Sequence, residues 1–151
     1  MRRWRTASEE ETRQLGAVLG GELVPDGILL LSGDLGVGKT VMAQGVAAAV
    51  GVPRKEVQSP SFILVREHEG STGRFTHIDL YRLEPEETEV LGMAEILAGE
   101  GVKVVEWAER LPCPPASALH ILIRVGGDGD EREIVATRLD QLDQTVNGSA
   151  R

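Results

Sequence analysis

Aromatic residues and cysteine are both scarce in this chain. Two Trp, one Tyr and two Phe among 151 residues leave the core to aliphatic side chains. The single cysteine, Cys113, cannot form an internal disulfide, so we expect a reducing, cytoplasmic setting. No apolar run approaches the roughly 20 residues of a membrane-spanning helix. The basic residues 1–5 precede no apolar stretch of the kind that a secretory signal needs.

Positive charge is also in short supply. Sixteen Lys and Arg stand against 24 Asp and Glu, a formal net charge of −8. Such a surface repels a phosphate backbone, so tight and direct nucleic-acid binding is not expected. Arg2, Arg3 and Arg5 are interpreted as a solvated mobile terminus, with a small basic patch as the alternative. Residues 84–100 contain six Glu and no Lys or Arg, which indicates a solvated face or a docking face for a basic partner.

Length and composition favour one folded domain. The chain is close to the roughly 150 residues of an average domain. With 41% hydrophobic and 26% charged residues, it has the balance of an ordinary globular protein. We therefore predict a single domain over residues 1–140 and a flexible polar tail over residues 141–151.

The first part of the chain alternates helical and strand patterns. Ser8 and Glu11 have the spacing of a capping box, which predicts a helix that ends at residues 20–21, both glycine. Residues 28–31 are apolar throughout, as in a central strand covered on both faces. Residues 40–50 have the apolar stripe of a helix. This order is typical of an α/β fold.

The second part predicts strands in hairpins. Two pairs of short runs flank turn-rich segments: 62–68 with 74–80 around 70–73, and 119–125 with 133–139 around 126–130. Residues 102–106 predict a further buried strand, and residues 84–100 one or two short helices broken near Gly92. We expect one mixed sheet flanked by helices, with parallel pairing early and antiparallel hairpins later.

The clearest motif is a phosphate-binding loop. Residues 33–40 match G-x-x-x-x-G-K-[ST] in full, between a predicted strand and a predicted helix. Glycines let backbone N–H groups face inward, and the following helix directs its positive end at the same anion. The Lys39 ammonium can contact phosphates and the Thr40 hydroxyl can bind Mg²⁺. Expected nucleotide contacts are Gly33, Asp34, Leu35, Gly36, Val37, Gly38, Lys39, Thr40 and Val41.

Two acidic residues end runs that we predict as strands. Glu106 follows a clear apolar run, whereas Asp79 follows a shorter and more polar one. Carboxylates at the C-terminal ends of strands lie where open α/β sheets bind ligands. A triphosphate site needs an acid for Mg²⁺ and often a second for the attacking water. Spacing alone leaves open which of the two binds the metal.

Several other residues have plainer interpretations. His77 is expected to be a hydrogen-bonded strand residue rather than a catalytic base. Trp107 is expected to be a core residue rather than a stacking platform. His68 and His120 show no cluster with acids or cysteine of the kind that a metal site needs, so no zinc site is expected. Residues 59–62 indicate a proline turn, with a loop that senses the γ-phosphate as the alternative.

Four motifs in order closely resemble the bacterial TsaE family, the small P-loop ATPases of tRNA threonylcarbamoyladenosine biosynthesis. They are the loop at 33–40, Ser-Pro-Ser-Phe at 59–62, His-Ile-Asp-Leu-Tyr-Arg-Leu at 77–83 and Val-Glu-Trp at 105–107. The likeness extends over nearly the whole chain, and the last two motifs are more specific than the loop. Ser61 stands where the family usually has Thr, which keeps a hydroxyl and loses a methyl group.

The resemblance implies a P-loop NTPase-like fold and a Mg²⁺-dependent ATPase that is slow alone. It implies TsaB and TsaD partners and a modification at adenosine 37 of tRNA, with tRNA contacted only through the complex. Lys39, Asp79 and Glu106 would be catalytic. By the family pattern, Lys39 and Thr40 hold phosphates and Mg²⁺, Glu106 is a metal ligand, Trp107 is the adjoining tryptophan, and Thr6 and Arg132 lie near the adenine.

Two rival functions use the same loop. A small-molecule or nucleotide kinase would need cations on the far side of the transferred phosphoryl group. Between Arg82 and Lys103 the chain has no Lys or Arg, in the region where a basic lid would be sought. A nucleotide-dependent switch with negligible hydrolysis is the third possibility.

Overall fold

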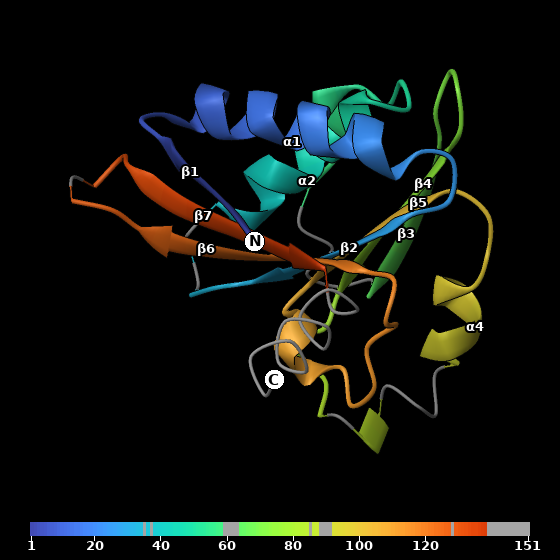
Figure 1. Ribbon diagram of the computed structural model, residues 1–151. Helices are drawn as coiled ribbons and strands as arrows, with labels where there is room; N and C mark the ends of the chain where they lie inside the picture. Colours follow the sequence, from blue (N-terminus) through green and yellow to red (C-terminus); the bar gives the residue numbers. More distant parts are fainter. Residues whose placement is uncertain are drawn as a thin grey trace, which may run out of the picture.

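A mixed sheet with strand order β1-β7-β6-β2-β5-β4-β3 forms the centre of the protein (Figure 1). This computed structural model describes residues 1–34, 36, 38–58, 64–84, 86–87, 92–127 and 129–138. The strands are β1 Arg2–Thr6, β2 Ile28–Ser32, β3 Val65–Glu69, β4 Arg74–Asp79, β5 Val102–Glu106, β6 Leu119–Val125 and β7 Arg132–Arg138. The predicted single mixed sheet is confirmed.

Parallel pairing is confined to the middle of the sheet. β2 pairs in parallel with β5 on one side and β6 on the other, and β4 pairs in parallel with β5. The pairs β3/β4, β6/β7 and β1/β7 are antiparallel, so both hairpins are confirmed. Because β2, β4 and β5 run the same way, their C-terminal ends meet at one edge of the sheet. Asp79 and Glu106 are direct register partners there.

Two helices cover one face of the sheet (Figure 1): α1 Glu9–Leu23 and α2 Lys39–Ala48. The predicted start of α1 is confirmed, because the Glu11 backbone N–H donates to the Ser8 hydroxyl over 3.1 Å. The predicted end at residues 20–21 is wrong, since α1 continues to Leu23. A Cβ at Gly20 would lie 2.8 Å from the Val46 carbonyl oxygen, so this glycine allows close helix packing.

The opposite face has a thinner cover. It carries the short helix α4 Met93–Leu97 and the 3₁₀ turn η2 Ala108–Arg110, while a second 3₁₀ turn, η1 Arg54–Glu56, follows α2. A short helix beginning after Gly92, where φ is 71°, agrees with the predicted break. Apolar residues form one core under α1 and α2 and a second, smaller core under α4 and η2.

The N-terminal residues form an edge strand, which corrects the expectation of a mobile terminus. β1 pairs with β7 at the far end of the chain, and Trp4 packs against the larger core. Arg2 and Arg5 form ion pairs with Glu22 and Glu133, each at 2.9 Å. The sequence pattern missed this strand because a single apolar residue stands among arginines.

Some predictions fall outside the described residues: the motif at 59–62, the tail at 141–151, and positions 35 and 37 of the loop. The first hairpin was expected from residue 62, and its described strand begins at Val65. In the part of the chain that the structure describes, no helix has the length and apolar character to cross a membrane.

The contact between α1 and α2 depends on glycines that face each other across the two helices. A single substitution can test this dependence. A Cβ at Gly45 would lie 2.1 Å from the Arg13 carbonyl oxygen and 2.9 Å from the Gly16 Cα. We predict that Gly45→Ala forces the helices apart and lowers the free energy of unfolding by about 2 kcal/mol or more.

Urea unfolding measures this change, with Gly21→Ala in α1 as the control. No atom lies within 4 Å of a Cβ at Gly21, so this variant should gain up to about 1 kcal/mol from helix propensity. Equal stabilities of the two variants would contradict the packing explanation.

Candidate nucleotide-binding site

The phosphate loop joins the end of β2 to the start of α2. Gly33, Gly36 and Gly38 have φ of 147°, 77° and 105°, a region that glycine enters at little cost. A Cβ at Gly36 or Gly38 would meet no atom within 4 Å. Glycine is therefore needed at these two positions for the positive φ, and not because a side chain would clash with its neighbours.

The first turn of α2 faces this loop without a side-chain cap. Gly38 is the N-cap, and no side chain caps the helix among the described residues. Helix N-termini leave N–H groups without intrahelical partners, and these groups bind anions well. Asp34 and Val41 lie on either side of this N-terminus in sequence. The loop therefore has the backbone features of a phosphate site.

Lys39 is buried at the centre of the site, with 5% of its surface exposed. Its Nζ donates to the Gly33 carbonyl oxygen over 2.6 Å and lies 3.4 Å from the centroid of the Trp107 ring. Burial lowers the pKa of Lys39 below its ordinary value, and four carboxylates act against that shift: Glu109, Glu106, Asp79 and Asp34. Because a neutral carbonyl and a ring hold this ammonium, a phosphate can replace them.

Thr40 and Glu106 meet beside Lys39. The Thr40 hydroxyl donates toward Oε1 and Oε2 of Glu106 at 3.2 and 3.3 Å. Glu106 is buried at the end of β5, next to the strand that precedes the loop. A hydroxyl and a carboxylate are ligands that Mg²⁺ prefers, and it usually shares them with phosphates and water. These residues therefore fit a nucleotide-associated magnesium ion.

No group of three or more His, Cys, Asp or Glu among the described residues is arranged to hold a metal by itself. Mg²⁺ is bound through one or two carboxylates together with substrate phosphates, rather than by all-protein cages. The residues present thus suit a metal that arrives with a nucleotide.

Asp79 lies beside Glu106 on the neighbouring strand. The two are register partners at the ends of β4 and β5, and Asp79 is buried. Its Oδ1 accepts a hydrogen bond from the Tyr81 backbone N–H over 2.9 Å. The structure therefore brings the two predicted acids together, with Glu106 directly contacting Thr40.

His77 lies behind Glu106, which sequence reasoning did not foresee. Its Nε2 is 2.5 Å from Glu106 Oε2, so the expectation of a hydrogen-bonded strand residue is confirmed. The identity of the partner depends on the register of β4 and β5. One signal was present in the sequence: His77 and Asp79 are two residues apart on a strand and so share a face.

Trp107 follows Glu106 in an unusual backbone conformation. Its φ of 59° is left-handed, which costs a non-glycine residue about 1–3 kcal/mol. The half-buried ring contacts Lys39 Nζ and lies 4.9 Å from the ring of Tyr81, which is 45% exposed. Trp107 packs against the smaller core, as expected, but it also touches the site lysine.

A small cavity of about 70 Å³ adjoins the loop. Its lining residues are Ser8, Glu9, Thr12, Gly36, Gly38, Val41, Asp130 and Arg132. Arg132, one of the two residues expected near the adenine, is therefore at the loop. Thr6 does not line the cavity, and its hydroxyl instead bonds that of Thr12 over 2.6 Å. Ser8 and Thr12 come from the start of α1 and Asp130 from the turn between β6 and β7, so sequence alone did not place them at the loop.

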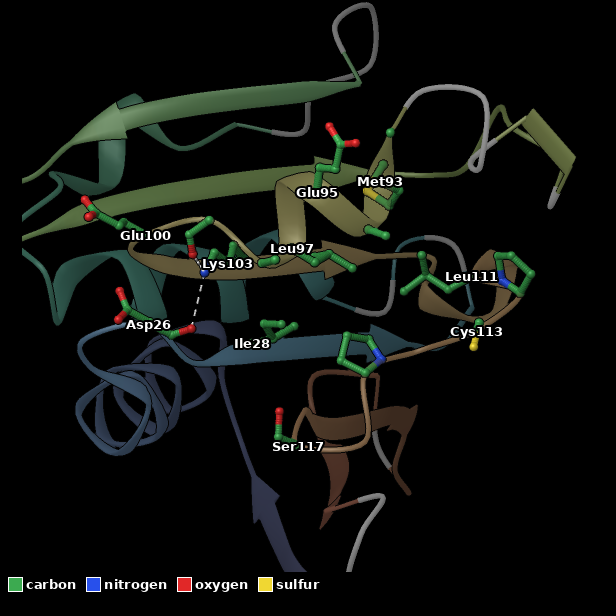
Figure 2. A pocket seen from close by; sticks show the side chains of 16 residues that line it. Asp26, Ile28, Met93, Glu95, Leu97, Glu100, Lys103, Leu111, Cys113 and Ser117 are labelled. Atoms are coloured by element: carbon green, nitrogen blue, oxygen red, sulfur yellow. Dashed lines mark hydrogen bonds between the residues drawn. The ribbon is translucent and has the colours of Figure 1, made fainter.

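A larger cavity of about 790 Å³ lies elsewhere, between α4 and residues 111–117 (Figure 2). None of its lining residues belongs to the phosphate loop. Lys103 lies in its wall, and its Nζ donates to the carbonyl oxygens of Asp26 and Gly99. Burial lowers the pKa of Lys103. This cavity is separate from the nucleotide-type site.

The chain is similar to known proteins over most of its length. The sequence profile of the family described as "Threonylcarbamoyl adenosine biosynthesis protein TsaE" matches residues 6–134. The tRNA threonylcarbamoyladenosine biosynthesis protein TsaE of Bacillus subtilis is 40% identical over 136 residues, which cover 89% of this chain and 84% of that protein. The protein of the same name from a Nostoc species is 35% identical, over 83% of this chain and 80% of the relative.

The fold also matches a solved structure. The crystal structure of Bacillus subtilis YdiB superposes with a TM-score of 0.72 and 31% sequence identity, and the match covers 99% of this chain and 96% of that one. The fold is thus of the P-loop NTPase type. Sequence and structure together show that the chain belongs to the TsaE family of threonylcarbamoyl adenosine biosynthesis proteins.

Proposed function

We propose that this protein binds ATP with Mg²⁺ at residues 33–40 and hydrolyses it as a subunit of tRNA threonylcarbamoyladenosine biosynthesis. The observation that supports the proposal best is the convergence of Lys39, Thr40 and Glu106 beside the glycine loop. We further propose a cytoplasmic complex with TsaB- and TsaD-type partners. The net charge of −8 favours tRNA contact through those partners.

Each site residue has a distinct role in this proposal. Lys39 leaves the Gly33 carbonyl and the Trp107 ring to contact the β- and γ-phosphates. Thr40 and Glu106 hold Mg²⁺, which when bound neutralises charge on the phosphate oxygens. Asp79, next to Glu106, orients the attacking water through its carboxylate. Arg132 lies at the small cavity beside the loop, where the adenosine part would extend.

An exposed aromatic residue beside the site supports the proposed dependence on partners. Tyr81 is 45% exposed and packs on Trp107, whose ring contacts Lys39. A partner that covers Tyr81 would therefore act on the lysine through one aromatic neighbour. Phosphoryl transfer also gains from an arginine supplied by another protein, by a factor of about 10³–10⁵. We propose slow hydrolysis alone and faster turnover in the complex.

A small-molecule or nucleotide kinase is the alternative use of the same loop. An acceptor would need its own site next to the γ-phosphate, with cations to neutralise the transferred group. Residues 83–102 contain no Lys or Arg, and the 790 Å³ cavity does not include the loop. Both observations favour hydrolysis over transfer to a bound acceptor.

The test combines calorimetry with product analysis. Calorimetry with a nonhydrolysable ATP analogue, with and without Mg²⁺, should give binding that Mg²⁺ strengthens. Phosphate release from ATP should be slow for the protein alone and rise when TsaB- and TsaD-type proteins are added. No heat of binding would refute the site, and labelled phosphate on a small acceptor would establish the kinase alternative.

We predict that Lys39→Met lowers nucleotide affinity by about 100-fold or more, because it removes the ammonium that contacts phosphate. The melting temperature of the nucleotide-free protein should not fall, since burial already disfavours this charge. Calorimetry and thermal unfolding measure the two effects. Lys103→Met removes the other buried lysine, away from the loop, and should keep wild-type affinity. Equal affinities of the two variants would contradict the role of Lys39.

We predict that Trp107→Leu strengthens binding of tripolyphosphate, a probe without a base. The ring competes with phosphate for the Lys39 ammonium, and a cation–π contact contributes about 0.5–2 kcal/mol, or roughly 2- to 30-fold in affinity. Tyr81→Leu removes a ring that contacts Trp107, and it should change this affinity less. Weaker tripolyphosphate binding by Trp107→Leu would show instead that the ring helps to hold phosphate.

A further inference from the structure

His77 is fully buried behind the acid to which the proposed function assigns the metal. The ring has 0% exposure, and its Nε2 lies 2.5 Å from Oε2 of Glu106, itself 3% exposed. We propose that His77 is a positioning residue that fixes the carboxylate of Glu106 for Mg²⁺. This inference rests on the proposed nucleotide site and assigns a role to a residue that touches neither nucleotide nor metal.

The strand register explains how His77 reaches Glu106. His77 is opposite Val104 and Asp79 is opposite Glu106 in the parallel pair of β4 and β5. Side chains two residues apart on a strand share a face, so His77, Asp79 and Glu106 all lie on one side of the sheet. The His77 side chain therefore reaches Glu106 diagonally across the strand pair, because on this face of β4 His77 is the residue that precedes Asp79. Displacing β4 by one residue would place the imidazole on the other face.

The two ring nitrogens of His77 have different surroundings. An ionised carboxylate only accepts hydrogen bonds, so Nε2 must be the donor to Glu106. Nδ1 is buried and has no hydrogen-bond partner among the described residues. The arrangement thus fits a ring with a proton on Nε2, a fixed donor to Glu106.

Glu106 is consequently held from two sides. His77 binds Oε2 from within the sheet, and Thr40 approaches Oε1 and Oε2 from the loop at 3.2 and 3.3 Å. Because the imidazole fixes Oε2, the carboxylate keeps one orientation, in which Oε1 lies beside the Thr40 hydroxyl. Outer groups that orient a metal ligand typically change metal affinity by about 10- to 100-fold when removed.

A role in packing alone is the competing explanation. The His77 ring lies 6.0 Å from the Phe75 ring, which in turn lies 5.9 Å from His68. His68 also has a buried Nε2 without a hydrogen-bond partner among the described residues, and it pairs in register with Phe75 rather than with an acid. It is the matched control, because it has the same chemistry and aromatic neighbour without the carboxylate.

The first experiment measures how much Mg²⁺ is needed for binding of a nonhydrolysable ATP analogue to the full chain. His77→Phe keeps ring volume and loses the donor, and it should raise the required Mg²⁺ concentration by about 10- to 100-fold. Its affinity for the analogue without Mg²⁺ should remain within about twofold of wild type, because phosphate contacts are untouched. His77→Gln, which restores an N–H donor, should recover most of the loss. His68→Phe should behave as wild type.

The second measurement needs neither metal nor nucleotide. NMR of protein labelled with ¹⁵N-histidine should show His77 with its proton on Nε2 and slow exchange with solvent. An unprotonated Nε2 would overturn the proposal even where His77→Phe fails to fold. Wild-type Mg²⁺ dependence in a folded His77→Phe would also overturn it and leave the proposed function intact. Absence of Mg²⁺-dependent binding in the wild type would instead refute the proposed function itself.

Discussion

Parallel pairing of β2 and β4 with β5 is the constraint on which the site depends. It brings the phosphate loop, Asp79 and Glu106 to one edge of the sheet, although they are far apart in the chain. A buried charge is costly unless its polar atoms are satisfied. Glu106 is satisfied by Thr40 and His77, and Lys39 by a backbone carbonyl and an aromatic ring. The side chains of the candidate site therefore satisfy one another, and Lys39 is held by partners that another group could replace.

The two faces of the sheet differ in how they are covered and packed. On one face, α1 and α2 pack closely through Gly16, Gly20 and Gly45, which fixes the N-terminus of α2 relative to the loop. The other face has a smaller core and a separate cavity beside α4 (Figure 2). Trp107 connects the two regions, because its ring packs on the smaller core and also touches Lys39. Lys39 and the exposed Tyr81 are therefore connected through a single side chain, that of Trp107.

The sequence predicted those features that depend only on residues close together in the chain. The loop, the apolar strand before it, the Ser8 cap and the acids at two strand ends are all specified by nearby residues. Features that need tertiary contact were missed. The sequence suggests a helix end at Gly20, whereas the structure shows that this glycine lets α1 pack closely against α2. β1 forms as a strand because it pairs with β7. The bond from His77 to Glu106 requires the register of two strands, and the left-handed Trp107 follows no residue-type preference.

Membership of the TsaE family fixes the fold and the biosynthetic context, and the proposed magnesium–nucleotide site depends on Lys39, Thr40 and Glu106. A crystal structure with Mg²⁺ and a nonhydrolysable ATP analogue tests it most directly. In that structure Lys39 Nζ should have moved from the Gly33 carbonyl onto a phosphate oxygen, with the metal between Thr40 and Glu106. An analogue bound away from the loop, or Lys39 still against Trp107 in the occupied site, would contradict the account.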